Sequence, residues 1–282
     1  MVINRSKLKY VPGTYAKKRP DATQMADQYI REWSQKQLKM KGQKIEPSTI
    51  PPAVCFSRKI GAGALEIADI LAEKIHYRVV DRELLEHMAK DKDLSKKTVE
   101  FFDERYPGKM SEFASMFFGE KSFIMSEYVK NLISALFTFA NMGSSIFVGR
   151  GAHLILPRDR VLAVRIICSN EYRIERLTDT LDVEETESEK LLHQIDREQH
   201  AFFKKVFGKK DASPYEFDLV INCDFISDPQ GAAEIVAQAG NPNSTKQSTF
   251  GNNRQFLRVD FVPAILKCIS GNIFKKLPFF WR

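Results

Sequence analysis

The segment Ala53–Asp81 constrains the fold of this chain more than any other part of it. A short apolar run, Ala53–Phe56, leads into a turn that contains Gly61 and Gly63. An amphipathic stretch follows, and then a second strand pattern at Tyr77–Val80. Glycines let the backbone turn tightly, and the free N–H groups at the start of the following helix attract an anion. The pattern therefore predicts a strand, a phosphate-binding loop, a helix and a second strand.

The predicted loop lacks two residue types that usually complete it. A full phosphate loop ends in Gly-Lys-Ser/Thr, where the lysine reaches the β- and γ-phosphates and the hydroxyl holds Mg²⁺. Here Gly63 is followed by Ala64-Leu65-Glu66. The sequence therefore retains the backbone cradle without the usual charge or metal ligand. Arg58 and Lys59 are candidates to replace the lysine, and no protein ligand for a metal is identifiable.

Composition restricts the class of protein. The chain has 282 residues, of which 43% are hydrophobic and 28% charged, as in a globular protein. Its net charge of +7 indicates either an ordinary solvated surface or a basic site for phosphates or a membrane surface. The four cysteines form no Cys-x-x-Cys pair, so we expect buried thiols rather than disulfides or zinc ligands. No run approaches the ~20 apolar residues of a spanning helix, and no signal-peptide pattern is present, so we expect a cytoplasmic protein.

The rest of the central region alternates strand and helix patterns. Further strands are predicted at Ser145–Val148, Val161–Cys168 and Leu219–Asn222. Such alternation favours an α/β fold: a three-layer architecture in which a parallel sheet has helices on both faces. A helix-rich block at 82–142 interrupts it, and its many phenylalanines indicate core packing or a base-stacking pocket. Later helices are predicted at Glu171–Thr180, Ser188–Phe207 and Pro229–Ala239.

Three regions are predicted along the chain. Residues 1–50 form a polar, basic extension with a charged helix at Gln24–Gln43, and residues 51–240 form the main domain. Residues 241–282 form a linker and an amphipathic tail. The aromatic and cationic residues of 256–282 suit either packing on the core or a subunit, or peripheral contact with the inner face of a membrane.

A set of strings across the main domain carries a family resemblance. Over about Ala53–Ala239 the chain resembles the cytidylate kinase-like proteins of the P-loop nucleoside monophosphate kinase group. The resemblance implies ATP on the loop, Mg²⁺, a CMP-like acceptor bound in the 82–142 block, and a basic lid at 184–210. The strings are SRKIGAGALEIADILAEKI, VVDRELLEHMA, FVGRGAHLIL, EYRIERL, IDREQHAFFKKVFG and FDLVINCD.

The resemblance also implies roles for individual residues. Arg150 matches the arginine of the family's Asp-Gly-Arg-Asp string, although both flanking acids are absent here. Arg197 is the best candidate for a lid cation, because a guanidinium can fork two phosphate oxygens. The implied catalytic residues are Arg150, Arg173 and Arg197. The implied acceptor-binding residues are Asp81, Arg82, Arg150 and Asp196, and the loop residues are Ser57, Arg58, Lys59, Gly61, Ala62, Gly63 and Ala64.

Each of these roles has an ordinary structural alternative. Asp81 can serve as the N-cap of the helix that starts at Arg82, and the charges of 184–210 can form a solvated helix face. At the level of function, the sequence favours a nucleoside monophosphate kinase. The alternative is a catalytically weak or inactive nucleotide-binding protein that acts through its tail. The basic residues are scattered among acids, so we do not expect nucleic acid as a partner.

Overall fold

The computed structural model describes residues 21–40, 50–118, 125–209 and 212–240. The predicted tail at 256–282 lies outside these residues. The described strands are β1 (Ala53–Arg58), β2 (Arg78–Val80), β3 (Ser145–Val148), β4 (Val161–Ile167) and β5 (Leu219–Asn222). The first helices are α1 (Ala22–Met40), α2 (Ala64–Ile75), α3 (Arg82–Lys90), α4 (Lys92–Arg105), α5 (Lys109–Phe118) and α6 (Glu127–Met142). The later ones are α7 (Ala152–Ile155), α8 (Asn170–Leu181), α9 (Glu185–Phe207) and α10 (Pro229–Ala239).

The strands form one parallel sheet in the order β2-β3-β1-β4-β5. Strand β1 lies at its centre, with Ala53 paired to Ser145 on one side and to Val161 on the other. Because the chain continues to both sides of β1, the carboxyl end of β1 is a switch point, where α/β proteins bind ligands. The predicted α/β fold with a parallel sheet is confirmed.

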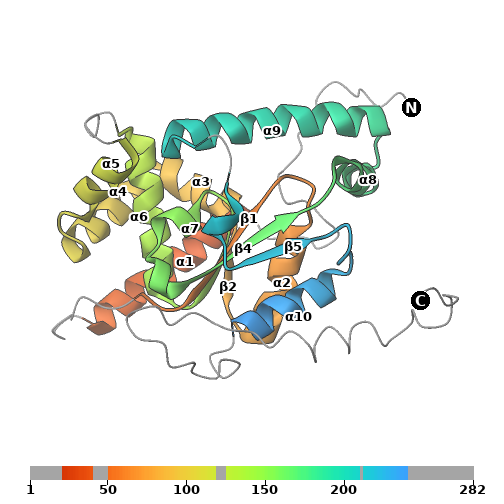
Figure 1. The fold of residues 1–282 in the computed structure, drawn as a ribbon. Coiled ribbons are helices and arrows are strands. Elements are labelled where there is room, and N and C mark those ends of the chain that lie inside the picture. Colours follow the sequence, from red (N-terminus) through yellow and green to blue (C-terminus); the bar gives the residue numbers. More distant parts are fainter. Residues whose placement is uncertain (1–20, 41–49, 119–124, 210–211, 241–282) are drawn as a thin grey trace, which may run out of the picture.

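Alternate residues of β1 enter two separate cores. Ala53 and Cys55 pack with α3, α6 and α7 on one face of the sheet, and Val54 and Phe56 pack with α2 and α10 on the other (Figure 1). A strand buried on both faces must be apolar at every position, which explains the continuous apolar run in the sequence.

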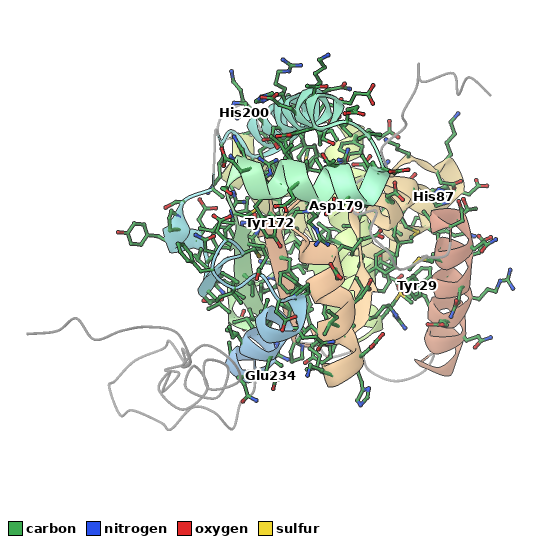
Figure 2. All side chains as sticks on the ribbon, turned by 90° about the vertical axis from the view of Figure 1, so that its right-hand side faces the viewer. Tyr29, His87, Tyr172, Asp179, His200 and Glu234 are labelled. Carbon is green, nitrogen blue, oxygen red and sulfur yellow. The ribbon has the colours of Figure 1, made fainter. Side chains whose placement is uncertain are left out.

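In the view of Figure 2, His200 of α9 and Glu234 of α10 lie at opposite ends of the molecule.

Helix α1 packs against this body. Ala26 is fully buried, and Tyr29 makes an edge-on contact with Phe139 of α6 at 5.6 Å between ring centroids. Arg78 of β2 donates to Glu32 at 2.8 Å. Helix α1, which was predicted at Gln24–Gln43 as part of a polar extension, is therefore attached to the domain. In the described part of the chain, none of the helices combines the length and apolar character that crossing a bilayer requires.

Helix α9 crosses the carboxyl ends of the strands (Figure 1). Its last residue, Phe207, packs over Gly151, whose φ is +70°. A Cβ at Gly151 would lie 2.5 Å from the Phe207 ring. That ring is itself held by Phe117, Phe202 and Phe203. Glycine is required here both by the backbone conformation and by the close approach of α9.

We expect Gly151→Ala to destabilise the protein and to displace the end of α9. The left-handed conformation costs a side chain roughly 1–2 kcal/mol, and overpacking the core adds about 1–3 kcal/mol. Gly208→Ala is the matched control, because Gly208 has a φ of +65° but nothing within 4 Å of an added Cβ. Urea unfolding of both variants separates strain from collision, and equal losses in the two would contradict the packing described.

Candidate functional site

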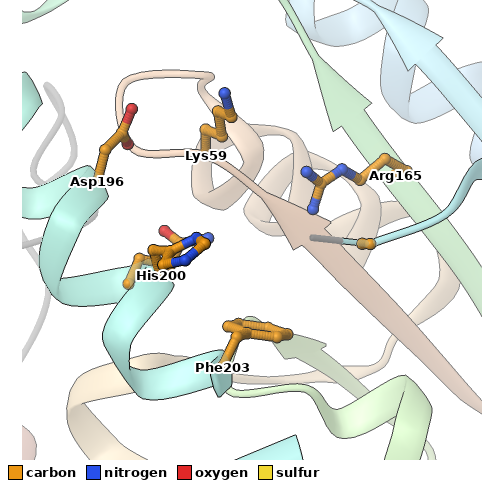
Figure 3. A pocket seen from close by; sticks show the side chains of 7 residues that line it. Lys59, Arg165, Asp196, His200 and Phe203 are labelled. Carbon is orange, nitrogen blue, oxygen red and sulfur yellow. The ribbon is translucent and has the colours of Figure 1, made fainter. Parts of the chain in front are cut away.

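Two adjoining pockets lie under α9 at the carboxyl ends of β1, β3 and β4. The first, here called the arginine pocket, has a volume of about 30 Å³. The second, here called the β4 pocket, has a volume of about 190 Å³ (Figure 3). The arginine pocket is lined by Ser57, Arg58, Arg82, Gly149, Arg150, Glu198, Gln199 and Phe203. The β4 pocket is lined by Lys59, Arg165, Asp196, Gln199, His200, Phe203 and Ala212.

The loop between β1 and α2 has the backbone of a phosphate cradle. Gly61 and Gly63 have φ values of +79° and +71°, and Gly63 is the N-cap of α2. No side chain caps this helix, and its first described backbone bond runs from the Ile67 N–H to the Gly63 carbonyl. The first-turn N–H groups of α2 are therefore available in the way that anion binding requires. Ile60 is buried against Leu177 of α8 and Leu192 of α9, which fixes the loop from outside.

An ion pair lies beside this cradle. The Arg176 guanidinium of α8 donates to the carboxylate of Glu66, in the first turn of α2. A Cβ added to Gly63 would lie 3.2 Å from the Arg176 Cζ atom, so this guanidinium covers the glycine directly. The tertiary structure thus places a cation next to a loop that has no lysine of its own.

Three guanidinium groups converge on the arginine pocket. Arg58 comes from the end of β1, Arg82 from the start of α3, and Arg150 from the turn after β3. Arg58 lies against Gly149, where an added Cβ would be 3.5 Å from the Arg58 Cζ atom. Several guanidiniums that meet in one pocket suit phosphate oxygens, which accept their forked, charge-assisted hydrogen bonds.

Arg150 is held rigidly within this cluster. Its Nη2 atom lies 2.6 Å from a carboxylate oxygen of Glu86, its Cζ atom lies 4.2 Å from the centroid of the Phe202 ring, and its side chain is 9% exposed. Its buried Nε atom has no hydrogen-bond partner among the described residues. Burial lowers the pKa of Arg150, and the nearby charge of Arg82 adds to this, while Glu86 opposes it. Its φ of +52° is a strained conformation for a non-glycine residue.

Glu86 is the residue that orients Arg150. Its carboxylate also accepts from the Tyr128 hydroxyl and pairs with Lys90. Burial alone would raise the pKa of Glu86, but Arg150, Lys90 and Tyr128 together lower it below its usual value. Glu86 is therefore ionised at neutral pH, and its carboxylate holds the Nη2 atom of the Arg150 guanidinium in place.

A hydrogen bond between neighbouring strands separates the two pockets. Arg165 of β4 donates from Nη1 to the Ser57 hydroxyl of β1 at 2.7 Å. The two residues are paired in the sheet register, so their side chains lie on the same face. Ser57 lines the arginine pocket and Arg165 lines the β4 pocket. The Arg165–Ser57 hydrogen bond therefore lies at the boundary between the arginine pocket and the β4 pocket.

A buried ion pair attaches α9 to α8 and the loop. Arg173 is completely buried, and it donates to the two Asp196 carboxylate oxygens at 2.9 and 2.6 Å. Its Nε atom donates to the Ile60 carbonyl at 2.6 Å. Gln199 of α9 adds a bond of 2.8 Å to the Arg58 carbonyl. Helix α9 is therefore fastened to the loop at two points.

Comparison with known proteins agrees with this geometry. The sequence profile of the cytidylate kinase-like family matches residues 53–224, more than half of the chain. The chain belongs to the cytidylate kinase-like family. Residues 57–212, which include every residue lining the two pockets, lie inside the matched region. No protein with a curated description matches the chain.

Solved structures with a similar arrangement include an uncharacterized protein from Eubacterium ventriosum. It is 19% identical, with a TM-score of 0.51 over 66% of this chain and 95% of its own. A shikimate kinase from Bacteroides thetaiotaomicron is 15% identical, with a TM-score of 0.33 over 66% and 94% of the two chains. A shikimate kinase from Acinetobacter baumannii, in complex with shikimate, is 18% identical, with a TM-score of 0.32 over 67% of this chain and 89% of its own. The likeness to the Eubacterium ventriosum protein concerns the fold alone.

The structure divides the site residues predicted from the sequence into three groups. Ser57, Arg58, Arg82 and Arg150 meet in the arginine pocket, and Lys59 and Asp196 line the β4 pocket. Gly61, Ala62, Gly63 and Ala64 form the loop and the first residue of α2. The remaining residues lie elsewhere: Asp81 accepts from the Leu84 N–H as the N-cap of α3, Arg173 is enclosed, and Arg197 is exposed on α9.

Sequence reasoning missed several residues that shape these pockets, among them Glu86, Arg165, Gln199 and Phe202. Arg165 carried a usable signal, because a lone cation interrupts the apolar strand Val161–Ile167. Glu86, Gln199 and Phe202 carried none, since acidic, amide and aromatic residues are common on helices. Their roles depend on which helices pack together.

Cysteine and histidine chemistry is not indicated in the part of the chain that is described. Cys55, Cys168 and Cys223 are free, and burial raises the pKa of each thiol, to about 12 for Cys168 and about 11 for Cys223. Burial lowers the pKa of His153 to about 4, so it is neutral at physiological pH. No group of three or more metal-ligating side chains occurs among the described residues.

The buried carboxyl of Asp69 on α2 predicts a pH effect on stability. Burial raises its pKa to about 7, and the charges of Asp81 and Glu73 act in the same direction. The unfolded value is about 3.9, so the folded state binds the proton more tightly and the free energy of unfolding falls as pH rises from about 4 to 7. We expect Asp69→Asn to remove this fall and to gain about 1–3 kcal/mol at pH 8. Thermal melts at pH 5 and 8 measure this change. Glu100→Gln, which removes an exposed carboxylate of α4, is the control, and a gain independent of pH would contradict the prediction.

Proposed function

We propose that this protein transfers the γ-phosphoryl group of ATP to the phosphate of a CMP-like nucleoside monophosphate. One observation carries the proposal: Arg58, Arg82 and Arg150 converge from three elements on one pocket at the switch point of the sheet. Family membership supports it, because the matched region contains this pocket.

The acceptor phosphate is the group whose charge matches the three guanidiniums of the arginine pocket. Several guanidiniums hold its charge and leave one oxygen to attack the γ-phosphorus in line. A bond then forms between that oxygen and the γ-phosphorus, the bond to the β-phosphate oxygen breaks, and the electron pair remains on ADP. This chemistry depends on positioning and on charge stabilisation rather than on proton transfer. Glu86 contributes by fixing the Arg150 fork.

The donor phosphates fit the loop at Gly61–Gly63 and the start of α2. The described residues contain no cluster that would hold Mg²⁺ alone, which suits an ion that is bound mainly by phosphates, water and one or two carboxylates. Glu66 is the carboxylate in the first turn of α2, and it is paired with Arg176. Mg²⁺ would neutralise charge on the donor, and the arginines position the acceptor.

Helix α9 acts as the cover of this site. A volume of about 30 Å³ is far below the roughly 300–1,000 Å³ of ligand pockets, so α9 lies close over the arginines. Acceptor entry therefore requires α9 to move outward. The Arg173–Asp196 pair and the Gln199 bond are the contacts at which that movement is resisted. We assign Arg173 and Asp196 to this positioning role.

A coupled binding and turnover experiment tests the proposal. We expect a thermal shift with CMP and with ATP, and ADP formation only when both are present with Mg²⁺. A ligand at 100 times its Kd stabilises by about 2.7 kcal/mol, which moves Tm by roughly 5–10 °C at this size. dCMP, UMP and AMP in parallel define the acceptor base.

Two outcomes would contradict the proposal. Binding of CMP and ATP without ADP formation would favour a nucleotide-binding regulatory protein instead, which the absence of the loop lysine makes the natural alternative. No shift with any nucleotide would mean that neither pocket takes phosphate.

A further inference from the structure

The β4 pocket contains a cation that neither the sequence pattern nor the proposed acceptor site explains. Arg165 lies in the middle of β4, between Val164 and Ile166, which are both completely buried on the opposite face. Arg165 is half-buried, so its guanidinium loses part of its hydration and polar or aromatic partners stabilise it; its Cζ atom lies 5.8 Å from the centroid of the Phe217 ring. Its Nη1 atom is bound to the buried Ser57 hydroxyl at 2.7 Å.

Three charged side chains, Lys59, Arg165 and Asp196, line this pocket. Both Asp196 oxygens accept from the buried guanidinium of Arg173, so its charge is already compensated. The other charged lining groups are Lys59 and Arg165. Figure 3 shows the Arg165 guanidinium directed toward the α9 side of the pocket, where His200 and Phe203 lie, and Lys59 on the loop near Asp196 with its ammonium pointing away from His200 and Phe203. A volume of about 190 Å³ suits a small anionic group rather than a whole nucleotide.

The position of the pocket identifies which anion it fits. It adjoins the arginine pocket, since Gln199 and Phe203 line both pockets and the Arg165–Ser57 bond lies between them. Lys59 is also the residue that leads from β1 into the loop. Phosphoryl transfer requires the reacting atoms to be about 3–3.5 Å apart, so the donor's terminal phosphoryl must lie in a site next to the acceptor phosphate.

We propose that the β4 pocket binds the terminal phosphoryl group of the donor and that Arg165, with Lys59, supplies the charge of the missing loop lysine. This inference rests on the proposed function, because it names the donor subsite of that reaction. Arg165 stabilises the phosphoryl group as its bond to the β-phosphate oxygen breaks, and the Ser57 hydroxyl holds the guanidinium in place.

Binding of inorganic tripolyphosphate and of CMP, measured separately by calorimetry, tests the assignment. We expect Arg165→Gln to weaken tripolyphosphate binding by about tenfold or more, as the loss of a charge-assisted contact, and to leave CMP binding unchanged. Lys59→Gln acts in the same direction. Arg165→Lys restores part of the affinity. Lys74→Gln is the matched control. Lys74 lies in the last turn of α2, away from the pockets, and its exposed side chain pairs with Glu234 of α10.

Steady-state kinetics gives the second readout. In Arg165→Gln we expect kcat to fall while the KM for CMP stays unchanged, whereas a merely structural arginine would change both together with Tm. Tripolyphosphate affinity equal to the wild type would overturn the assignment while leaving the proposed function intact. An equal loss of CMP and tripolyphosphate binding with a lowered Tm would also overturn it. Wild-type protein that binds neither probe would overturn both proposals.

Discussion

Replacing Arg150 with glutamine is expected to lower the rate of CMP phosphorylation by about 10²–10³, the usual effect of removing one group that stabilises the transferred charge. Arg150 is constrained on two sides, since Glu86 and the Phe202 ring fix its guanidinium. Glutamine retains a hydrogen-bond donor but loses the charge and the fork. Initial rates of ADP formation at saturating ATP measure the effect.

The controls for this prediction separate charge from fold. Lys97→Gln removes one positive charge from an exposed position on α4 that lines neither pocket, and it should leave the rate unchanged. Arg150→Lys keeps the charge without the bidentate geometry and should recover only part of the rate. An Arg150→Gln enzyme of normal Tm and normal rate would remove this residue from the mechanism.

The largest stability loss is expected at Asp196. Asp196→Ala leaves the completely buried guanidinium of Arg173 without its counter-charge, and uncompensated buried charges cost about 3–5 kcal/mol. At roughly 2–4 °C per kcal/mol, Tm should fall by about 6–20 °C. Arg173→Met should cost less, because the Asp196 side chain that it leaves behind is 28% exposed and can be hydrated.

Glu234→Ala is the matched control, since it breaks an ion pair of similar length between exposed side chains of α10 and α2. Exposed pairs contribute about 0–1 kcal/mol, so this variant should be nearly neutral. Denaturant unfolding gives all three values, and a double-mutant cycle gives the coupling between Arg173 and Asp196. Equal costs at Asp196 and Glu234 would show that the Arg173 pair is not a structural anchor.

Several elements could be read from local sequence because their signals are local. Strands β3 and β5 and helix α10 were predicted with the bounds that the structure shows, and β4 was predicted one residue too long. A buried parallel strand must be apolar, Asp228 and Pro229 mark the start of α10, and Gly61 and Gly63 supply positive φ in the loop. The 82–142 block was predicted as helical, but its division into α3, α4, α5 and α6 was not.

The pairing of charges could not be predicted in the same way. Arg173 and Arg176 share a helix face and look equivalent in the sequence, yet Arg173 is buried on Asp196 while Arg176 covers Gly63 and binds Glu66. Which partner each guanidinium meets depends on the angle at which α8 and α9 lie over the loop. That angle is set by the packing of Ile60, Leu177, Leu192 and Ile195.

The sequence alone determined the α/β class, the order of the strands along the chain, the glycine loop and the absence of its lysine, because periodicity, turn chemistry and motif identity are properties of neighbouring residues. Only the tertiary structure decided where replacement charge is found. Arg165 and Ser57 are 108 residues apart in the chain, and they meet because β1 and β4 are adjacent in the sheet. Arg58, Arg82 and Arg150 converge because parallel strands place their carboxyl ends at one edge.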